Sequence, residues 1–271
     1  MNPVKRNLPV YVVDAFTTQS FQGNPAAVCV LDRLREATWL QAVAAEMNLS
    51  ETAFLLEEDG SWQLRWFTPK VEVDLCGHAT LAAAHILWET ASVPHEQPVT
   101  FETRSGRLTC IQDGSWIEMD FPSEPPVDAG DPGDLLAALN SDGVVVGHKR
   151  NRMDFLVEVK DEQTVRSLKP DMRLLASLPV RGVIVTSPSD NPSFDFVSRF
   201  FAPAAGINED PVTGSAHCCL GPYWGAKLGK KEMVGFQAST RGGTVRVALR
   251  GDRVILAGQA VTVLRAQLSP V

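Results

Sequence analysis

The chain lacks most features of secreted, membrane-bound and nucleic-acid-binding proteins. It holds only five cysteines in 271 residues, an odd number that makes no disulfide framework, so a reducing, cytoplasmic setting is expected. No stretch approaches the roughly 20 apolar residues of a membrane-spanning helix, and we expect no signal peptide at the start. The net charge of −7, without a basic cluster, argues against nucleic-acid and membrane partners.

Several catalytic signatures are missing as well. The sequence contains no P-loop, no dinucleotide-binding fingerprint and no Gly-x-Ser-x-Gly motif. The vicinal pair Cys218-Cys219 has the wrong spacing for zinc. His78 and His85 have no acidic or cysteine partner at the spacing of a known ligand set. We therefore expect neither a metal nor a cofactor.

What the chain does have is an internal repeat. Arg65-Trp66-Phe67-Thr68-Pro69 corresponds to Arg199-Phe200-Phe201-Ala202-Pro203. Each copy continues through a loop to a glycine, in Cys76-Gly77-His78-Ala79 and in Thr213-Gly214-Ser215-Ala216. The two glycines are 137 positions apart, and the loop before the second is three residues longer. A repeat on this scale predicts two similar lobes, and small-molecule sites usually lie in clefts between domains.

The hydrophobic periodicity predicts mostly antiparallel strands and few helices. Helices are expected over residues 37–47, 77–89 and 214–228, the last kinked at Gly221-Pro222. A further helical segment is expected over residues 164–178, broken at Pro170. The second and third contain so few charged residues that each should be surrounded by protein. The expected fold class is α+β, with two pseudo-symmetric lobes, each a mostly antiparallel sheet or barrel wrapped around a central helix.

A Pro/Gly/Asp-rich stretch over residues 122–133 predicts the boundary between the lobes. We expect an N-terminal lobe of residues 1–126 and a C-terminal lobe of residues 127–271. An alternative assignment places the last strand in the N-terminal lobe.

The two equivalent helix starts carry the first candidate chemistry. A helix that begins with glycine, as at Gly77 and Gly214, offers unpaired amides and partial positive charge to a carboxylate or phosphate. His78 suits proton transfer near neutral pH. Ser215 is either a helix cap or a donor to a substrate oxygen, and Thr213 is an alternative cap.

Three further residues have a functional and a purely structural interpretation. Asp210 either complements the helix dipole or orients a substrate group, or pairs with His78. Glu51 is a surface carboxylate or a partly desolvated acid/base. Cys76 is structural or a thiol activated by the helix start. Because its repeat partner Thr213 is no base, a symmetric two-thiol mechanism is not available.

Four motifs, at residues 13–16 with 21–25, 49–54, 75–80 and 209–216, together resemble the phenazine-biosynthesis (PhzF-like) isomerase family. They follow the family's order and span nearly the whole chain. The resemblance implies a diaminopimelate-epimerase-like fold, a homodimer, and a cofactor-free isomerase that moves a proton on a small carboxylic acid. The best-known activity of the family isomerises a dihydro-hydroxyanthranilate.

The resemblance also implies residue roles. Glu51 matches the general acid/base, and His78, Asp210 and Ser215 match residues that position the substrate or assist proton transfer. Cys76 is similar to the first catalytic cysteine of the epimerases.

The substrate-binding residues expected on the same grounds are Asn24, Gly77, Thr213 and Gly214. Two other functions stay open, a one-thiol epimerase or racemase using Cys76 and a non-catalytic small-acid binding or interaction protein.

Overall fold

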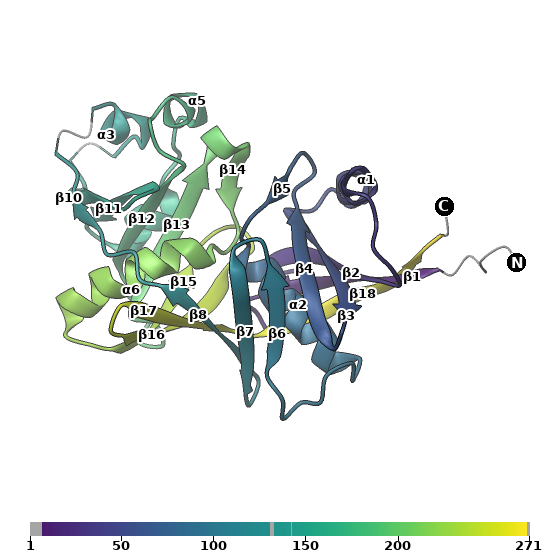
Figure 1. Ribbon diagram of the computed structural model, residues 1–271. Coiled ribbons are helices and arrows are strands. Elements are labelled where there is room, and N and C mark those ends of the chain that lie inside the picture. Colours follow the sequence, from purple (N-terminus) through teal and green to yellow (C-terminus); the bar gives the residue numbers. More distant parts are fainter. Residues whose placement is uncertain (1–6, 131–132, 142, 270–271) are drawn as a thin grey trace, which may run out of the picture. The chain divides into compact units, whose positions relative to one another are not determined.

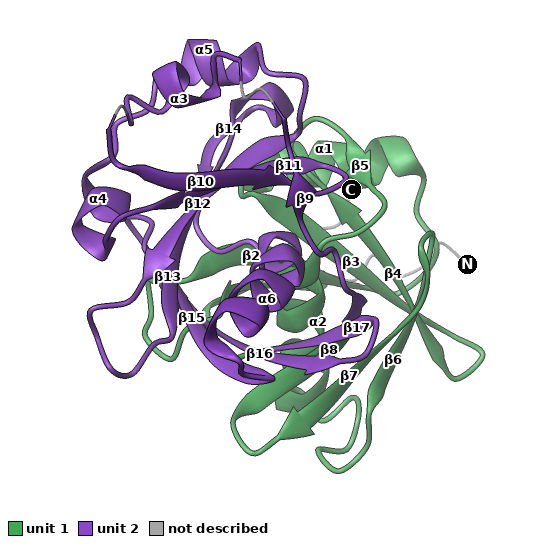
Figure 2. Ribbon diagram, turned by 90° about the vertical axis from the view of Figure 1, so that its left-hand side faces the viewer, with its two compact units in different colours: residues 1–120, 257–271 green, residues 121–256 purple. Residues whose placement is uncertain are grey.

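The computed structural model describes residues 7–130, 133–141 and 143–269, and it confirms an α+β fold dominated by strands (Figure 1). The chain divides into two compact units. Unit 1 consists of Met1–Asp120 and Ala257–Val271, and unit 2 of Phe121–Leu256 (Figure 2). The final strand therefore belongs to unit 1.

Unit 1 contains nine strands and two helices among its described residues. The strands are β1 (Leu8–Ala15), β2 (Asn24–Leu31), β3 (Glu51–Glu58), β4 (Ser61–Phe67), β5 (Glu72–Val73), β6 (Val99–Thr103), β7 (Gly106–Asp113), β8 (Trp116–Pro122, which ends two residues inside unit 2) and β18 (Ala260–Leu268). The helices are α1 (Ala37–Met47) and α2 (Gly77–Glu89).

Unit 2 contains nine strands and five helices among its described residues. The strands are β9 (Val127–Asp128), β10 (Val145–Arg150), β11 (Asp154–Val159), β12 (Gly182–Pro188), β13 (Phe196–Ala202), β14 (Ile207–Asp210), β15 (Glu232–Gln237), β16 (Gly243–Arg250) and β17 (Arg253–Gly258, which ends inside unit 1). The helices are α3 (Leu135–Ala138), α4 (Glu162–Ser167), α5 (Met172–Ala176), the short 3₁₀ helix η1 (Pro203–Ala205) and α6 (Gly214–Leu228).

The two units repeat one topology. In unit 1, β1–β2, β3–β4 and β6–β7 pair antiparallel, while β2–β3 and β4–β6 pair parallel. In unit 2, β10–β11, β12–β13 and β15–β16 pair antiparallel, while β11–β12 and β13–β15 pair parallel. The repeat in the sequence thus corresponds to a repeat in the strand topology of the two units.

The long helix of each unit is its core element. Ten of the 13 residues of α2 are buried, and α2 contacts β1, β2, β3 and β18 of its own unit. Small alanines and the lack of charge before Glu89 allow strands to pack on several sides of the helix. In unit 2, α6 contacts β15 and β16.

Helix α6 runs through Pro222 without ending. Proline has no N–H, so the carbonyl of Cys218, four residues earlier, loses its helical donor. The backbone N–H of Glu124 donates to that carbonyl at 3.0 Å. This bond, with one from the Ser123 N–H to the Asp252 carbonyl at 2.9 Å, attaches the residues after Asp120 to unit 2, ahead of the boundary expected at 126/127.

The repeated motif has the same local geometry in both units. In unit 1, Arg65 donates two hydrogen bonds to Glu72, at 2.7 and 2.8 Å. In unit 2, Arg199 donates two to Glu209, at 2.7 and 2.9 Å. Each guanidinium also lies over the aromatic ring two residues further along its strand, 5.1 and 4.7 Å from the ring centre. A bidentate pair fixes the loop before each helix.

The turn between β1 and β2 is tightly constrained. Phe16, Phe21 and Gly23 all have positive φ, of 64°, 70° and 65°, and the Phe21 N–H donates to Asp14 Oδ2 at 2.6 Å. A Cβ on Gly23 would lie 2.2 Å from the carbonyl oxygen of Ala15. Only glycine fits at this position of the turn that leads to Asn24.

Across the part of the chain that the structure describes, no helix has both the length and the apolar character needed to cross a membrane.

Candidate active site

Unit 1 brings four of the predicted site residues into one cluster. His78 Nε2 lies 3.1 Å from Glu51 Oε2, and the Asn24 side-chain amide lies 3.2 Å from the other ring nitrogen, Nδ1. Cys76 Sγ is 3.5 Å from Nδ1 and 3.9 Å from Nε2. The imidazole is therefore held at both nitrogens, by a carboxylate on one side and an amide on the other.

The topology explains why these residues meet. Asn24 is the first residue of β2 and Glu51 the first of β3, and these strands run parallel with Ala26 opposite Glu51. Neighbouring parallel strands start at the same edge of the sheet. Helix α2 begins at Gly77, so His78 lies in its first turn, and α2 packs on β2 and β3.

Burial makes the cluster electrostatically sensitive. The side chains of His78 and Glu51 are only 7% and 13% exposed. Burial alone would lower the pKa of His78, but the adjacent Cys76 sulfur and Glu51 carboxylate hold it well above its usual value. Burial, together with the Glu51 charge, raises the pKa of the Cys76 thiol. The raised pKa of His78 therefore favours the protonated imidazole at neutral pH, in contact with the Glu51 side chain.

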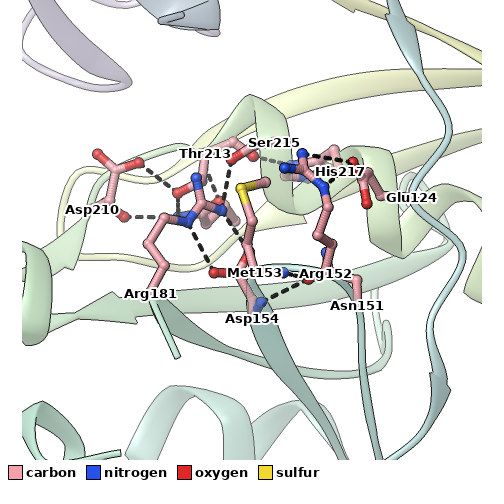
Figure 3. A network of polar contacts seen from close by, with 11 residues as sticks. Glu124, Asn151, Arg152, Met153, Asp154, Arg181, Asp210, Thr213, Ser215 and His217 are labelled. Atoms are coloured by element: carbon pink, nitrogen blue, oxygen red, sulfur yellow. Dashed lines mark hydrogen bonds and ion pairs between the residues drawn. The ribbon is translucent and has the colours of Figure 1, made fainter. Parts of the chain in front are cut away.

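Unit 2 gathers the other predicted residues at the start of α6 (Figure 3). Thr213 Oγ1 donates to Asp210 Oδ2 at 2.5 Å. The Gln237 side chain accepts from the Thr213 N–H at 2.9 Å and donates to the Asp210 carbonyl at 2.7 Å. This network fixes the loop that leads into Gly214.

Ser215 has a partner that the sequence did not suggest. Arg181 Nη2 donates to Ser215 Oγ at 3.0 Å, and the same guanidinium donates to both oxygens of Asp154, at 2.9 and 2.5 Å. Asp154 is fully buried, and the guanidinium lies 5.3 Å from the centre of the Phe200 ring. Arg181 is thus clamped on two sides while it orients the hydroxyl of Ser215.

Equivalent positions carry different chemistry in the two units. In unit 1 the residue opposite Phe67 directly follows Glu51. In unit 2 the residue opposite Phe201, the repeat partner of Phe67, directly follows Gly182. Where unit 1 has a carboxylate, unit 2 therefore has a glycine preceded by Arg181. Only unit 1 carries an acid/base residue at this junction.

The side chains of the two N-cap residues do not cap their helices. Neither Cys76 before α2 nor Thr213 before α6 makes a capping hydrogen bond in the described structure. The expectation that Thr213 or Ser215 caps α6 is wrong for Thr213, because its hydroxyl donates to Asp210 instead. The first-turn amides of a helix suit an anionic ligand.

One histidine was overlooked in the sequence. His217 Nδ1 lies 2.8 Å from the Thr213 carbonyl, and none of the described residues bonds its Nε2. Burial lowers the pKa of His217 to about 4, so the ring is neutral and Nδ1 is the donor. The His217 side chain therefore stabilises the first turn of α6 by donating to the Thr213 carbonyl.

The family follows from sequence comparison. The profile of the phenazine biosynthesis-like (PhzC-PhzF) proteins matches residues 13–266. The chain belongs to this PhzF family. A Halalkalibacterium halodurans protein named as an uncharacterized isomerase is 58% identical, covering 96% of this chain and 98% of its own. A Pseudomonas aeruginosa protein named in the same way is 48% identical with the same coverage. This PhzF-family chain is accordingly an isomerase.

Solved structures agree with the family assignment. The crystal structure of a PhzF-family phenazine biosynthesis protein from Enterococcus faecalis is 42% identical with a TM-score of 0.92, over 97% of this chain and 99% of that one. A hydroxyproline epimerase from Agrobacterium vitis has a TM-score of 0.61 over 98% and 93% of the two chains, at 12% identity. That second likeness extends the shared fold to the epimerases.

Proposed function

We propose that this PhzF-family isomerase moves a proton on a small carboxylic acid without a cofactor, with Glu51 as the proton shuttle. The observation that carries the proposal is the buried Glu51–His78 pair at 3.1 Å, in contact with Asn24 and Cys76. His78 holds the carboxylate through Oε2, which leaves the other oxygen to take a substrate proton. A carboxylate held in place by a hydrogen-bonded imidazole is positioned for proton transfer.

The chemistry is a proton abstraction followed by return. Glu51 removes a proton from a carbon activated by neighbouring unsaturation, and the carbanion charge spreads into that system. The protonated Glu51 then delivers the proton to another carbon, so the double bond migrates and nothing else is consumed. Isomerisation of a dihydro-hydroxyanthranilate, the activity implied by the resemblance, is a reaction of this type.

The unit 2 cluster supports substrate binding in the same proposal. The family resemblance assigns Asp210 and Ser215 to the same reaction as Glu51. The α6 start, with its first-turn amides and the Arg181 guanidinium beside Ser215, favours a carboxylate. We assign Asn24, Gly77, Thr213 and Gly214 to substrate binding. We also propose that the protein works as a homodimer, and the molar mass from light scattering tests this.

The test is isotope exchange. The protein is incubated in D₂O with a panel of small cyclic and amino carboxylic acids, including a dihydro-hydroxyanthranilate, and label uptake is read by mass spectrometry. Glu51→Gln keeps the shape of the side chain and should lower the exchange rate at least about 100-fold. Retention of the full rate in this variant would refute Glu51 as the shuttle.

A one-thiol epimerase is the second candidate, because Cys76 Sγ lies 3.5 Å from His78 Nδ1. The raised pKa of this thiol counts against it. The two candidates separate in one experiment. Cys76→Ser keeps most of the exchange rate if Glu51 is the shuttle and loses it if the thiol is the base.

A further inference from the structure

The unit 1 cluster combines three side chains that bind metals in other proteins. Glu51, Cys76 and His78 each offer one ligand atom, and these atoms all lie within 4.8 Å of one another. Linear spacing hides the set, because Glu51 starts β3 whereas Cys76 and His78 flank the start of α2. Only the folded chain shows a carboxylate, a thiol and an imidazole converging.

Two of the three distances between ligand atoms are close to the edges of a tetrahedral site. Zinc bonds of about 2.0–2.3 Å to nitrogen, oxygen and sulfur place neighbouring ligand atoms roughly 3.2–3.8 Å apart. Here His78 Nε2 is 3.1 Å from Glu51 Oε2 and 3.9 Å from Cys76 Sγ. Both edges are within a few tenths of an ångström of those values. The third edge, between the Glu51 carboxylate and Cys76 Sγ, lies within 4.8 Å, so metal binding requires these two side chains to rotate toward each other.

A supporting residue is also in place. Metal-bound imidazoles almost always donate their second ring N–H to an oxygen. The Asn24 amide lies 3.2 Å from His78 Nδ1, and Ser50 Oγ lies 3.5 Å from Asn24 Oδ1. With the amide turned over, its oxygen accepts the Nδ1–H and Ser50 accepts from its nitrogen.

We propose that Glu51, Cys76 and His78 form a three-ligand site for a thiophilic divalent cation such as Zn²⁺ or Cd²⁺, and that the ion inhibits the enzyme. The carboxylate and the thiolate balance the charge of the ion. On binding, the thiol releases its proton and the imidazole carries its remaining proton on Nδ1. A fourth position is left for water, as in three-ligand zinc sites.

The binding claim is independent of turnover and is tested without substrate. The full chain is titrated with Co²⁺ and with Cd²⁺, and the thiolate-to-metal charge-transfer band and the bound stoichiometry are recorded. One ion per chain with a charge-transfer band is expected, and Zn²⁺ should displace Co²⁺. Absence of the band, with no bound ion at micromolar metal, would overturn the proposal.

Variants identify the ligands. Cys76→Ser should abolish the band and weaken binding by more than about 100-fold, since losing a ligand costs more than losing a supporting hydrogen bond. Cys110→Ser is the matched control, because Cys110 is a buried thiol of unit 1 outside the cluster. Loss of the band in Cys110→Ser but not in Cys76→Ser would assign the metal elsewhere.

Glu51→Gln guards against a folding artefact in Cys76→Ser. It should retain the charge-transfer band, because the thiol stays, but bind the ion more weakly. Circular dichroism of each variant verifies its fold. Unchanged affinity in Glu51→Gln would remove the carboxylate from the ligand set and overturn the three-ligand site.

Inhibition of the enzyme by the bound ion is tested separately, and this part of the proposal rests on the proposed function. The isotope-exchange rate of the wild-type protein should fall as Zn²⁺ is added, in step with site occupancy, and return with a chelator. Metal binding with unchanged exchange would refute the inhibition and count against Glu51 as the shuttle. Exchange that is lost in Glu51→Gln without any metal binding would refute this site alone.

Discussion

At the scale of single residues, the Arg181–Asp154 ion pair in unit 2 combines a buried carboxylate with a partly exposed guanidinium. Asp154 is fully buried, whereas the Arg181 side chain is 35% exposed. A buried carboxylate that loses its cation keeps its desolvation cost without compensation. The pair therefore stabilises unit 2 and, through the hydrogen bond to Ser215, also fixes a candidate substrate-binding hydroxyl.

We expect Arg181→Gln to lower the free energy of unfolding by about 3 kcal/mol, because it leaves Asp154 buried and unpaired. The measurement is chemical denaturation. Arg152→Gln is the matched control, since Arg152 is 71% exposed in its ion pair with Glu124 and should change stability by less than about 1 kcal/mol.

A second variant completes the test of this pair. Adding Asp154→Asn to Arg181→Gln should recover part of the lost stability, because the unpaired charge is removed. If the double variant is as unstable as the sum of the two single ones, the two side chains do not act as a pair.

His217 sets a pH dependence of stability. Its pKa is about 4 in the folded chain and near 6.5 when unfolded. Between these values the unfolded chain binds a proton that the folded chain does not. Stability therefore falls as the pH is lowered from about 6.5 to 4, by roughly 3 kcal/mol from this residue.

Replacing His217 tests that dependence. His217→Asn keeps a donor for the Thr213 carbonyl and cannot titrate, so its unfolding free energy should vary less over this pH window than that of the wild type. The exposed His95, replaced in the same way, is the control for losing a histidine outside the core. Identical profiles for wild type and His217→Asn would contradict the assignment.

At the scale of elements, the strand–loop–helix repeat shows how a shared frame supports different chemistry. The bidentate Arg–Glu pairs, Arg65 with Glu72 and Arg199 with Glu209, hold equivalent loops. The frame is constant, while the residue after each helix glycine differs. It is His78 in unit 1 and Ser215 in unit 2, an imidazole in one unit and a hydroxyl in the other.

The turn before β2 gives a prediction at this scale. Gly23 and Gly60 both have positive φ, but only a Cβ on Gly23 meets the backbone, since nothing lies within 4 Å of one on Gly60. Gly60→Ala should cost about 1–2 kcal/mol from its backbone conformation alone. Gly23→Ala should cost roughly 1–3 kcal/mol more through overpacking, as read by urea denaturation. Equal costs would show that the turn relaxes freely.

The sequence predicted the bounds of the long helices more accurately than the contacts between distant residues. The bounds of α1, α2 and α6 were read correctly, because apolar residues at helical spacing, few charges and a helix-starting glycine in α2 and α6 are local signals. Strands β5, β9, β10, β14 and β15 were not foreseen. Three of them have only two to four residues, and β10 and β15 each contain a glycine, Gly147 and Gly235, which weakens a periodic pattern.

The candidate site was predicted only as separate motifs. No local pattern shows that Glu51 and His78 touch, because they lie 27 positions apart and meet through strand pairing and helix packing. Arg181 and Asp154 were missed because each looks like an ordinary charged residue. Their importance comes from burial, which a single sequence does not reveal.

At the scale of the whole molecule, all five cysteines are free and buried. Burial raises the pKa of Cys29, Cys110, Cys218 and Cys219 to about 12, so at pH 8 only about one thiol in ten thousand is a thiolate. We expect less than one thiol per chain to react quickly with a thiol reagent under native conditions, and five after denaturation. Rapid labelling of two or more thiols in the native protein would show that a unit opens.

The path of the chain also has a consequence for its synthesis. Strand β1 pairs with β2 on one side and β18 on the other, with Leu8 opposite Leu268. A ribosome makes the first strand early and its second neighbour last, so unit 2 is synthesised in full while unit 1 still lacks a strand. During that interval one edge of β1 has no strand beside it, and such an edge attracts other chains. In the nascent protein, β18 therefore protects the exposed edge of β1 once it has been synthesised.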